Sequence, residues 1–202
     1  MKILIACEES QTVCKAFREK GHEAYSCDIQ ECSGGHPEWH IQGDVLPLLD
    51  QNWDLIIAHP PCTYLTNGGA VRMYKSKGVI DMNRFAKAME AKEFFMAFVN
   101  AKCPKVVIEN PVPMTCVGLP KYTQIIQPYQ FGEPYSKKTC LWLKGLQPLQ
   151  PTKILTEYQP FINGGGGRLN KPNYKGKQFA NGSKNRSKTF EGIAKAMAEQ
   201  WG

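Results

Sequence analysis

Short apolar runs alternate with helix-patterned stretches through the first half of the chain. Five runs are predicted to be strands, at residues 2–7, 22–28, 41–44, 53–59 and 105–109. Apolar residues at helical spacing predict helices at 10–20, which Gly21 ends, and at 81–100. Because helices separate strands that are mostly apolar, we expect a parallel sheet covered on both faces.

The second half of the chain has a different pattern. Residues 127–131 and 139–143 resemble two strands, and Gly132 and Pro134 between them predict an antiparallel hairpin. An amphipathic helix is expected at 189–201, with Thr189 as its N-cap. The whole pattern predicts an α/β fold, a doubly wound sheet that a hairpin completes.

Composition favours one soluble domain that spans residues 1–202. The chain has 202 residues, of which 42% are hydrophobic and 21% charged. No apolar run approaches the roughly 20 residues that a membrane-spanning helix needs, so we expect no membrane partner. The first strand leads directly to Glu8 and Glu9, unlike a signal peptide. We therefore expect a cytoplasmic protein whose eight cysteines stay reduced.

The net charge of +7 is concentrated in one stretch. Residues 158–190 contain no Asp or Glu, and the stretch carries Arg168, Lys171, Lys175, Lys177, Lys184, Arg186 and Lys188. A basic segment with interspersed aromatic residues is typical of an arm that contacts nucleic-acid phosphates. A solvated surface loop is an equally simple interpretation.

Residues with chemical potential follow the predicted strands, where ligands bind in sheets of this kind. Cys62 comes after Pro60-Pro61, which stiffen the backbone and fix the direction of the thiol. Glu109 ends the next strand. Alone, each is more simply a buried thiol or a loop carboxylate. Their placement at neighbouring strand ends favours a site in which Cys62 is a nucleophile.

These residues resemble two motifs of the DNA cytosine-5 methyltransferases. Pro60-Pro61-Cys62 is similar to the motif that supplies the nucleophile, and Glu109-Asn110-Pro111 to the pair that binds the cytosine edge. The chain most resembles the short members found in phages and prophages. The resemblance implies a Rossmann-like class I methyltransferase fold, S-adenosylmethionine as cofactor, DNA as substrate, and Cys62 and Glu109 as catalytic residues.

The resemblance also implies binding roles for residues elsewhere in the chain. Asp28 is expected to bind the cofactor ribose and Asp44 to lie near the adenine, and the cofactor-binding residues together are Cys7, Glu8, Asp28, Asp44 and Pro60. The expected substrate-binding residues are Asn110, Lys137, Lys138, Arg72, Lys184 and Arg186. Residues 67–77 are predicted to form a mobile loop over the base. Residues 144–188 replace the family's separate target-recognition domain with a short irregular basic segment.

Three alternatives remain open at this point. Residues 7–12 contain no glycine, unlike the first loop of the family, which favours a non-catalytic protein that binds nucleic acid or nucleotides. A methyltransferase that acts on a free cytidine nucleotide is the second. The third is other chemistry: a zinc site from Cys27, Cys32, His36 and His40, or a hydrolase that pairs Cys62 with His59. We expect no metal.

Overall fold

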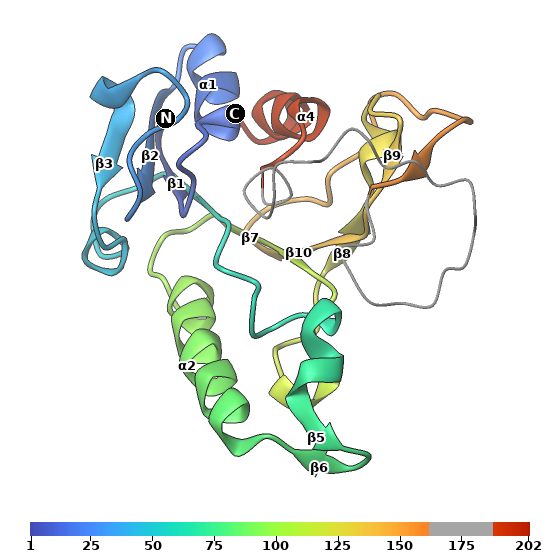
Figure 1. Cartoon of the computed structure of the whole chain (residues 1–202). Coiled ribbons are helices and arrows are strands. Elements are labelled where there is room, and N and C mark those ends of the chain that lie inside the picture. The colour runs from blue at the N-terminus through green and yellow to red at the C-terminus, as the bar shows by residue number, and fades with distance from the viewer. Residues whose placement is uncertain (162–187) are drawn as a thin grey trace.

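The computed structural model describes residues 1–161 and 188–202. Its main sheet has seven strands in the order β3-β2-β1-β4-β7-β10-β8 (Figure 1). These strands are β1 (Lys2–Ala6), β2 (Glu23–Asp28), β3 (His40–Gln42), β4 (Leu55–Ala58), β7 (Val106–Pro111), β8 (Gln124–Ile126) and β10 (Thr139–Lys144). The first five are parallel, whereas β10 runs antiparallel to both of its neighbours, β7 and β8.

Helices cover both faces of the sheet. Helices α1 (Thr12–Glu19) and α4 (Glu191–Trp201) pack on one face, and α2 (Met82–Val99) packs on the other (Figure 1). Alternation along β1 explains this arrangement, because Ile3 and Ile5 pack with α1 and α4 while Leu4 and Ala6 pack on the side of α2. Burial on both sides is why these strands are apolar throughout.

The observed fold confirms the predicted α/β class and the predicted helices, with ends that shift by one or two residues. The predicted third strand is displaced toward the N-terminus, to His40–Gln42. No helix in the described ranges is long and apolar enough to cross a membrane.

The predicted hairpin is wrong in its first strand. The partner of β10 is β8, which precedes the predicted stretch, and Pro128–Gln130 forms a 3₁₀ helix. Pro128 lacks an N–H to donate to a sheet, and its fixed φ suits the first turn of a helix. The Gln130 side chain then accepts from the Gln127 N–H at 2.7 Å, which closes a capping box.

Thr189 is not the N-cap of the last helix. Phe190 occupies that position, and the Thr189 hydroxyl donates instead to Glu109 Oε2 at 3.0 Å. Helix α4 comes very close to the segment after β8, because a Cβ on Gly192 would lie 2.0 Å from the Phe131 carbonyl oxygen. Glycine at that position therefore lets α4 begin where Thr189 can contact Glu109.

Residues 67–77, predicted as a mobile loop, form a folded extension instead. Asn67–Met73 is a 3₁₀ helix, and β5 (Tyr74–Ser76) pairs with β6 (Val79–Ile80). The fully buried Met73 side chain joins the core under α2 and anchors the extension. The remaining elements are the two-stranded pair β9 (Tyr135–Ser136) and β11 (Gln159–Pro160) and the 3₁₀ helices Pro37–Trp39, Leu46–Leu48 and Thr115–Val117.

Candidate active site

Four strand ends meet at the carboxyl edge of the sheet. Strands β2, β1, β4 and β7 are consecutive neighbours, and their register pairs Ala6 with Ala58 and Ala58 with Ile108. The residues that follow these pairs are Cys7, His59 and Glu109. The strand order therefore places these three side chains, which are far apart in the sequence, at one edge of the sheet.

A buried ion pair joins the ends of β4 and β7. His59 Nδ1 lies 3.0 Å from Glu109 Oε2, and each side chain is 11% exposed. The Thr189 hydroxyl donates to the same carboxylate oxygen. Among the residues that the structure describes, His59 Nε2 has no hydrogen-bond partner although it is buried. A buried donor without a partner is costly, which suggests a place for a ligand or water.

The pKa values of this pair move in opposite directions. Burial would lower the pKa of His59, but the hydrogen bond to Glu109 and the charges of Glu109 and Glu8 outweigh it, so the pKa is raised. Burial would raise the pKa of Glu109, but its bond to His59, the charges of His59 and Lys137 and the Thr189 bond lower it. Both shifts favour the form of the pair in which His59 is an imidazolium and Glu109 a carboxylate.

Cys62 lies on a loop that is bound to β7 and α2. Asn110, the residue after Glu109, donates from Nδ2 to the Pro60 carbonyl at 2.8 Å. On the other side, Arg84 of α2 donates to the Thr63 carbonyl at 3.3 Å. The Cys62 carbonyl accepts from the N–H groups of Leu65 and Thr66, three and four residues further on, so the loop makes a tight turn after Cys62. The thiol is half-buried.

The first loop replaces glycine with side chains that bond inside the protein. Glu8 is buried, and its carboxylate accepts from the N–H groups of Val13 and Cys14 at the start of α1. Gln11 is fully buried and bonds Ser26 and the backbone of His36.

The backbone of this loop nevertheless keeps the shape that glycine would allow. Cys7 and Gln11 have φ values of 60° and 57°, in the left-handed region that most side chains avoid. Each such residue costs roughly 1–3 kcal/mol, and such strain is concentrated at functional sites. The loop therefore makes two left-handed turns without a glycine.

Cys7, Asp28 and Asp44 lie close together, as the cofactor prediction requires. The pKa of the Cys7 thiol is raised by burial first and then by the charges of Asp28, Cys27 and Asp44. Asp28 accepts from the Gln30 N–H through Oδ1, and its carbonyl accepts from the Gly43 N–H. The ends of β2 and β3 are thereby joined beside Cys7.

The predicted substrate-binding cations are divided among three places. Lys137 is half-buried and near enough to Glu109 and His59 to affect the pKa of both. Lys138 is exposed beside it, whereas Arg72 is exposed on the folded extension under α2. Lys184 and Arg186 lie outside the described residues.

An aromatic cluster lies between Lys137 and the chain on either side of residues 162–187. The rings of Phe161 and Phe190 are 4.7 Å apart, and Tyr135 contacts both. The Lys137 ammonium lies over the rings of Phe161 and Phe190, at 5.6 Å and 5.8 Å. Phe161 and Phe190, on either side of residues 162–187, therefore both lie beside Lys137.

The geometry does not favour either of the other predicted chemistries. In residues 1–161 and 188–202, no three His, Cys, Asp or Glu side chains form a group that could hold a metal ion. Of the four residues of the zinc alternative, Cys27 is fully buried in β2 and His40 bonds Ser26. The Nδ1 atom of His59 faces Glu109, so this nitrogen is engaged away from a hydrolase-like pair with Cys62.

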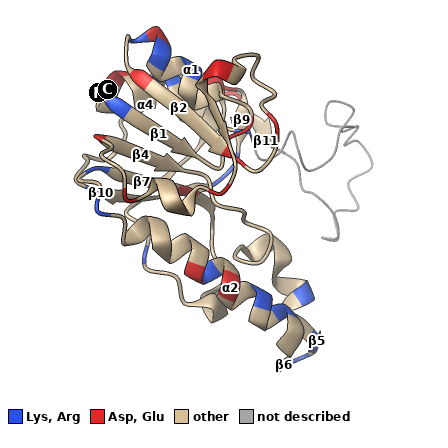
Figure 2. Ribbon diagram, turned by 90° about the vertical axis from the view of Figure 1, so that its left-hand side faces the viewer, with Lys and Arg blue, Asp and Glu red and all other residues tan. Residues whose placement is uncertain are grey.

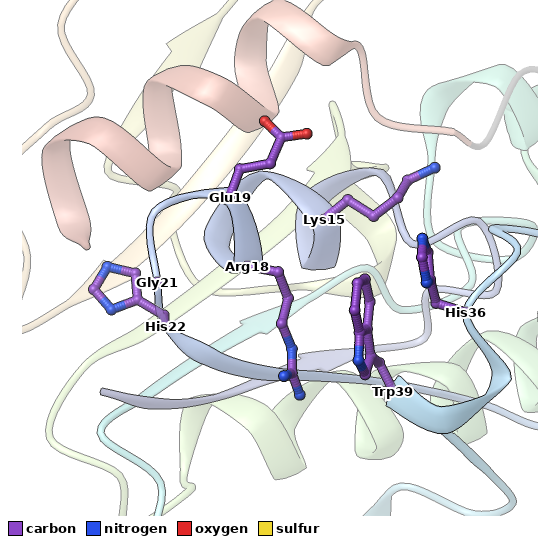
Figure 3. A pocket seen from close by; sticks show the side chains of 7 residues that line it. All are labelled: Lys15, Arg18, Glu19, Gly21, His22, His36 and Trp39. Carbon is purple, nitrogen blue, oxygen red and sulfur yellow. The ribbon is translucent and has the colours of Figure 1, made fainter.

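A cavity of about 530 Å³ lies beside α1 and contains none of the predicted site residues. Its lining residues are Lys15, Arg18, Glu19, Gly21, His22, His36 and Trp39 (Figure 3). Trp39 stacks on His36, and the Arg18 guanidinium lies over the other side of the Trp39 ring, 4.9 Å from its centre. Arg18 also donates to the Ala24 carbonyl. Arg18, Trp39 and His36 thus contact one another in the cavity wall, and the candidate chemistry lies at the strand ends instead.

Inspection of the sequence would miss two residues near the site, Arg84 and Thr189, but a local signal identifies a third, His59. Nothing local marks Arg84 or Thr189 as neighbours of the site. His59, however, is the first polar residue after its apolar strand, as Glu109 is after the adjacent one. Residues at that shared position face each other in a parallel pair.

Comparison with known proteins gives only remote structural matches. No protein-family model and no curated protein matches the chain. A candidate DNA modification methyltransferase from an E. coli prophage matches with 13% identity and a TM-score of 0.47, over 76% of this chain and 51% of that one. The methyltransferase EhMeth of Entamoeba histolytica matches with 14% identity and a TM-score of 0.46, over 76% and 57%.

A mutant DNMT2 of Spodoptera frugiperda has 14% identity and a TM-score of 0.39, over 80% of this chain and 55% of that one. The chain thus spans about half the length of these structures. Its own strand order, with β10 antiparallel between β7 and β8, establishes the fold. It is a Rossmann-like α/β fold.

Proposed function

We propose that this chain is an S-adenosylmethionine-dependent DNA cytosine-5 methyltransferase with Cys62 as its nucleophile. The observation that carries the proposal is the bond from Asn110 Nδ2 to the Pro60 carbonyl. It ties the rigid loop that presents Cys62 to the strand that presents Glu109. A thiol and a carboxyl on adjacent strand ends are the two groups that activation of a pyrimidine ring requires.

The chain's residues would activate cytosine in one addition step. The Cys62 thiolate forms a bond to C6 while the electrons of the C5–C6 double bond shift toward N3, which takes a proton from Glu109. This makes C5 nucleophilic, since the ring now contains an enamine. S-adenosylmethionine, when bound, supplies the methyl group that C5 accepts. Loss of the C5 proton to solvent water then expels the Cys62 thiolate and restores the ring.

The ends of β1 and β2 fit the cofactor in two respects. The left-handed backbone at Cys7 keeps the turn that allows a ligand to approach the chain closely. Asp28 is half-buried at the end of β2, and Oδ2 has no partner among the described residues, so this oxygen is available to accept from ribose hydroxyls. Cys7, Glu8, Asp44 and Pro60 would form the walls, although Glu8 contributes mainly through its bonds to α1.

Cations on two surfaces support DNA as the substrate. The extension carries Arg72, Lys75 and Lys77, all exposed, and Figure 2 shows Lys and Arg around β5 and β6. Lys137 provides positive charge beside Glu109. We propose that these groups contact phosphates, together with Lys138, Lys184 and Arg186. Residues 144–188 would then act within a single domain in place of a separate recognition domain.

One observation favours a second candidate, a non-catalytic binding protein with the same fold. Glu8 and Gln11 use their side chains for bonds within the protein, where a cofactor-binding loop would have exposed backbone. Such a protein would bind nucleic acid and transfer nothing.

Transfer of labelled methyl groups distinguishes the candidates. Wild-type protein is incubated with labelled S-adenosylmethionine and duplex DNA, single-stranded DNA or deoxycytidine monophosphate in parallel. We expect label in DNA and none in the nucleotide. Label in the nucleotide alone would replace DNA with a free nucleotide as the substrate, and binding without label in any arm would favour the non-catalytic protein.

A further inference from the structure

His59 is a buried titratable group that the addition step described above does not use. It lies between two carboxylates, in direct contact with Glu109 and within electrostatic range of Glu8. We propose that His59 stores the proton that Glu109 gives to cytosine N3, and so acts as a positioning residue through Glu109. This inference rests on the proposed function.

The bonds to Glu109 divide its two oxygens between separate tasks. His59 Nδ1 and the Thr189 hydroxyl both lie 3.0 Å from Oε2. No described residue donates to Oε1, which is therefore left to face a base. Two donors on one oxygen also fix the plane of the carboxylate, so Oε1 keeps one direction.

Charged groups on three sides determine where the proton rests. Glu8, on the loop after β1, and Glu109, on β7, both favour the imidazolium, whereas Lys137, before β10, opposes it. Lys137, His59 and Thr189 together keep Glu109 ionised. We therefore place the one proton of the resting pair on His59 and none on Glu109, so that Glu109 alone has no proton to donate.

The relay balances without an outside acid. When the thiolate adds to C6, Glu109 Oε1 must deliver a proton to N3, and the His59 Nδ1–H transfers its proton to Oε2. Glu109 is again a carboxylate and His59 is neutral. When the Cys62 thiolate leaves, N3 returns the proton to Glu109 and His59 recovers it. The pair therefore carries one proton through the cycle and regenerates its starting state.

The pH profile of methyl transfer to DNA tests the relay. Wild-type activity should persist until pH exceeds the raised pKa of His59. In His59→Gln, only Glu109 can hold the proton, so activity should fall at lower pH, by about tenfold for each pH unit above the pKa of Glu109. Profiles that differ only in height would overturn the proposal.

Two control variants separate the relay from a structural role. Thr189→Val removes the other donor to Oε2 but leaves His59 in place to hold the proton, so its activity should be lower while its decline at high pH stays near that of wild type. His36→Gln changes a histidine that stacks on Trp39, away from the site, and should leave the profile unchanged. A Thr189→Val profile shifted like that of His59→Gln would assign the effect to geometry and overturn the proposal.

Titration of the histidines by NMR tests the proton store without any turnover. The chain has four histidines, and His59 should titrate above the ordinary range in the wild-type protein and at lower pH in Glu109→Gln. A His59 that is neutral at pH 7 would overturn the inference, even if His59→Gln does not fold. If methyl transfer fails while His59 titrates high, the proposed function is wrong, and the relay to cytosine is overturned with it although His59 holds a proton beside Glu109.

Discussion

The two halves of the carboxyl edge use their polar groups differently. At the ends of β4 and β7, His59 Nε2 and Asn110 Oδ1 are buried without hydrogen-bond partners among the described residues. At the end of β1, the buried side chains of Glu8 and Gln11 have several partners within the protein. Buried polar atoms normally have partners. The ends of β4 and β7 therefore have polar atoms available to a ligand, whereas the polar side chains at the end of β1 mainly stabilise their own loop.

This difference separates the two parts of the functional proposal. The ends of β4 and β7 form the substrate half of the edge, and the ends of β1 and β2 form the cofactor half. The substrate half has a charged pair and unsatisfied polar atoms that folding alone does not explain. On the cofactor half, the support consists of the backbone at Cys7 and the carboxylate of Asp28. Experiments that weaken one half at a time can therefore test them separately.

Loss of the Cys62 thiol should have the largest effect. An oligonucleotide that contains 5-fluorocytosine should trap wild-type protein as a covalent adduct with S-adenosylmethionine present, because fluorine cannot leave C5 as a proton does. Cys62→Ser should form no adduct, as seen by denaturing electrophoresis. Cys116→Ser is the matched control, since both thiols are half-buried, and it should be trapped normally. Trapping of the Cys62→Ser protein would remove the nucleophile from the substrate half.

Asn110→Ala should reduce the rate while Cys62 remains in place. The variant loses the bond to the Pro60 carbonyl, so the loop that carries Cys62 is no longer held against β7. A displacement of about 1 Å can cost roughly 100-fold in rate. Single-turnover methyl transfer should show a loss of that order in the chemical step, while Asn100→Ala, at the exposed end of α2, stays near wild type. An unchanged rate would show that Asn110 does not position the nucleophile.

Much of this site can be predicted from the sequence because it depends on local patterns. Apolar runs locate the strands, and the first polar residues after them, including His59 and Glu109, locate the edge where ligands bind. The contact between Thr189 and Glu109 joins residues 80 positions apart and has no local signature. The same applies to Gln11, whose bonds to His36 depend on how two loops meet.

The errors in the fold have physical causes of the same kind. Residues 127–131 have the composition of a strand, but Pro128 and the capping Gln130 turn them into a 3₁₀ helix. Glycines and cations at 67–77 suggested a mobile loop, yet burial of Met73 fixes that segment to the core. In each case one residue's tertiary or capping contact outweighs the average propensity of the segment.

Asp28→Ala tests the cofactor half. If Asp28 binds the ribose, S-adenosylmethionine should bind more weakly by roughly 1–3 kcal/mol, the cost of leaving polar groups without a partner. Calorimetry measures this difference. Asp50→Ala is the control, because Asp50 pairs only with Lys102 at the surface, and it should not change the affinity. Equal affinities for wild type and Asp28→Ala would show that this carboxylate is outside the cofactor site.

Removal of the cations on the extension should have a smaller effect, on salt dependence. Each phosphate contact contributes roughly 0.9 to the slope of log affinity against log salt concentration on duplex DNA. Replacement of Arg72, Lys75 and Lys77 by Gln should therefore reduce that slope by about 2 to 3 if all of them contact phosphates. DNA affinity is measured at several salt concentrations.

A second triple variant controls for net charge. Lys20, Lys102 and Lys195 are exposed and lie away from the extension, so their replacement by Gln lowers the charge by the same amount. We expect a slope close to wild type. Equal reductions in both triple variants would mean that the extension acts through overall charge and does not contact DNA.

Glu8→Gln should have the smallest effect and tests whether the first loop is costly to maintain. Burial raises the pKa of Glu8, and the charge of Glu109 adds to this, whereas the charge of His59 and the bonds to Val13 and Cys14 act in the opposite direction without cancelling it. A carboxyl whose pKa is higher in the folded state stabilises the protein below its unfolded-state pKa, and that stability is lost as pH rises through the folded-state pKa. The stability of Glu8→Gln relative to wild type should therefore increase with pH, by about 1.4 kcal/mol for each unit of difference between the two pKa values.

Thermal or urea unfolding from pH 4 to pH 8 measures this difference in stability. The control is Glu199→Gln, which changes a surface residue paired with Lys20. If the relative stability decreases with pH instead, the helix bonds outweigh burial. Glu8 would then be a favourable anion at the start of α1, and the first loop would stabilise the fold without the cost that its buried charge implies.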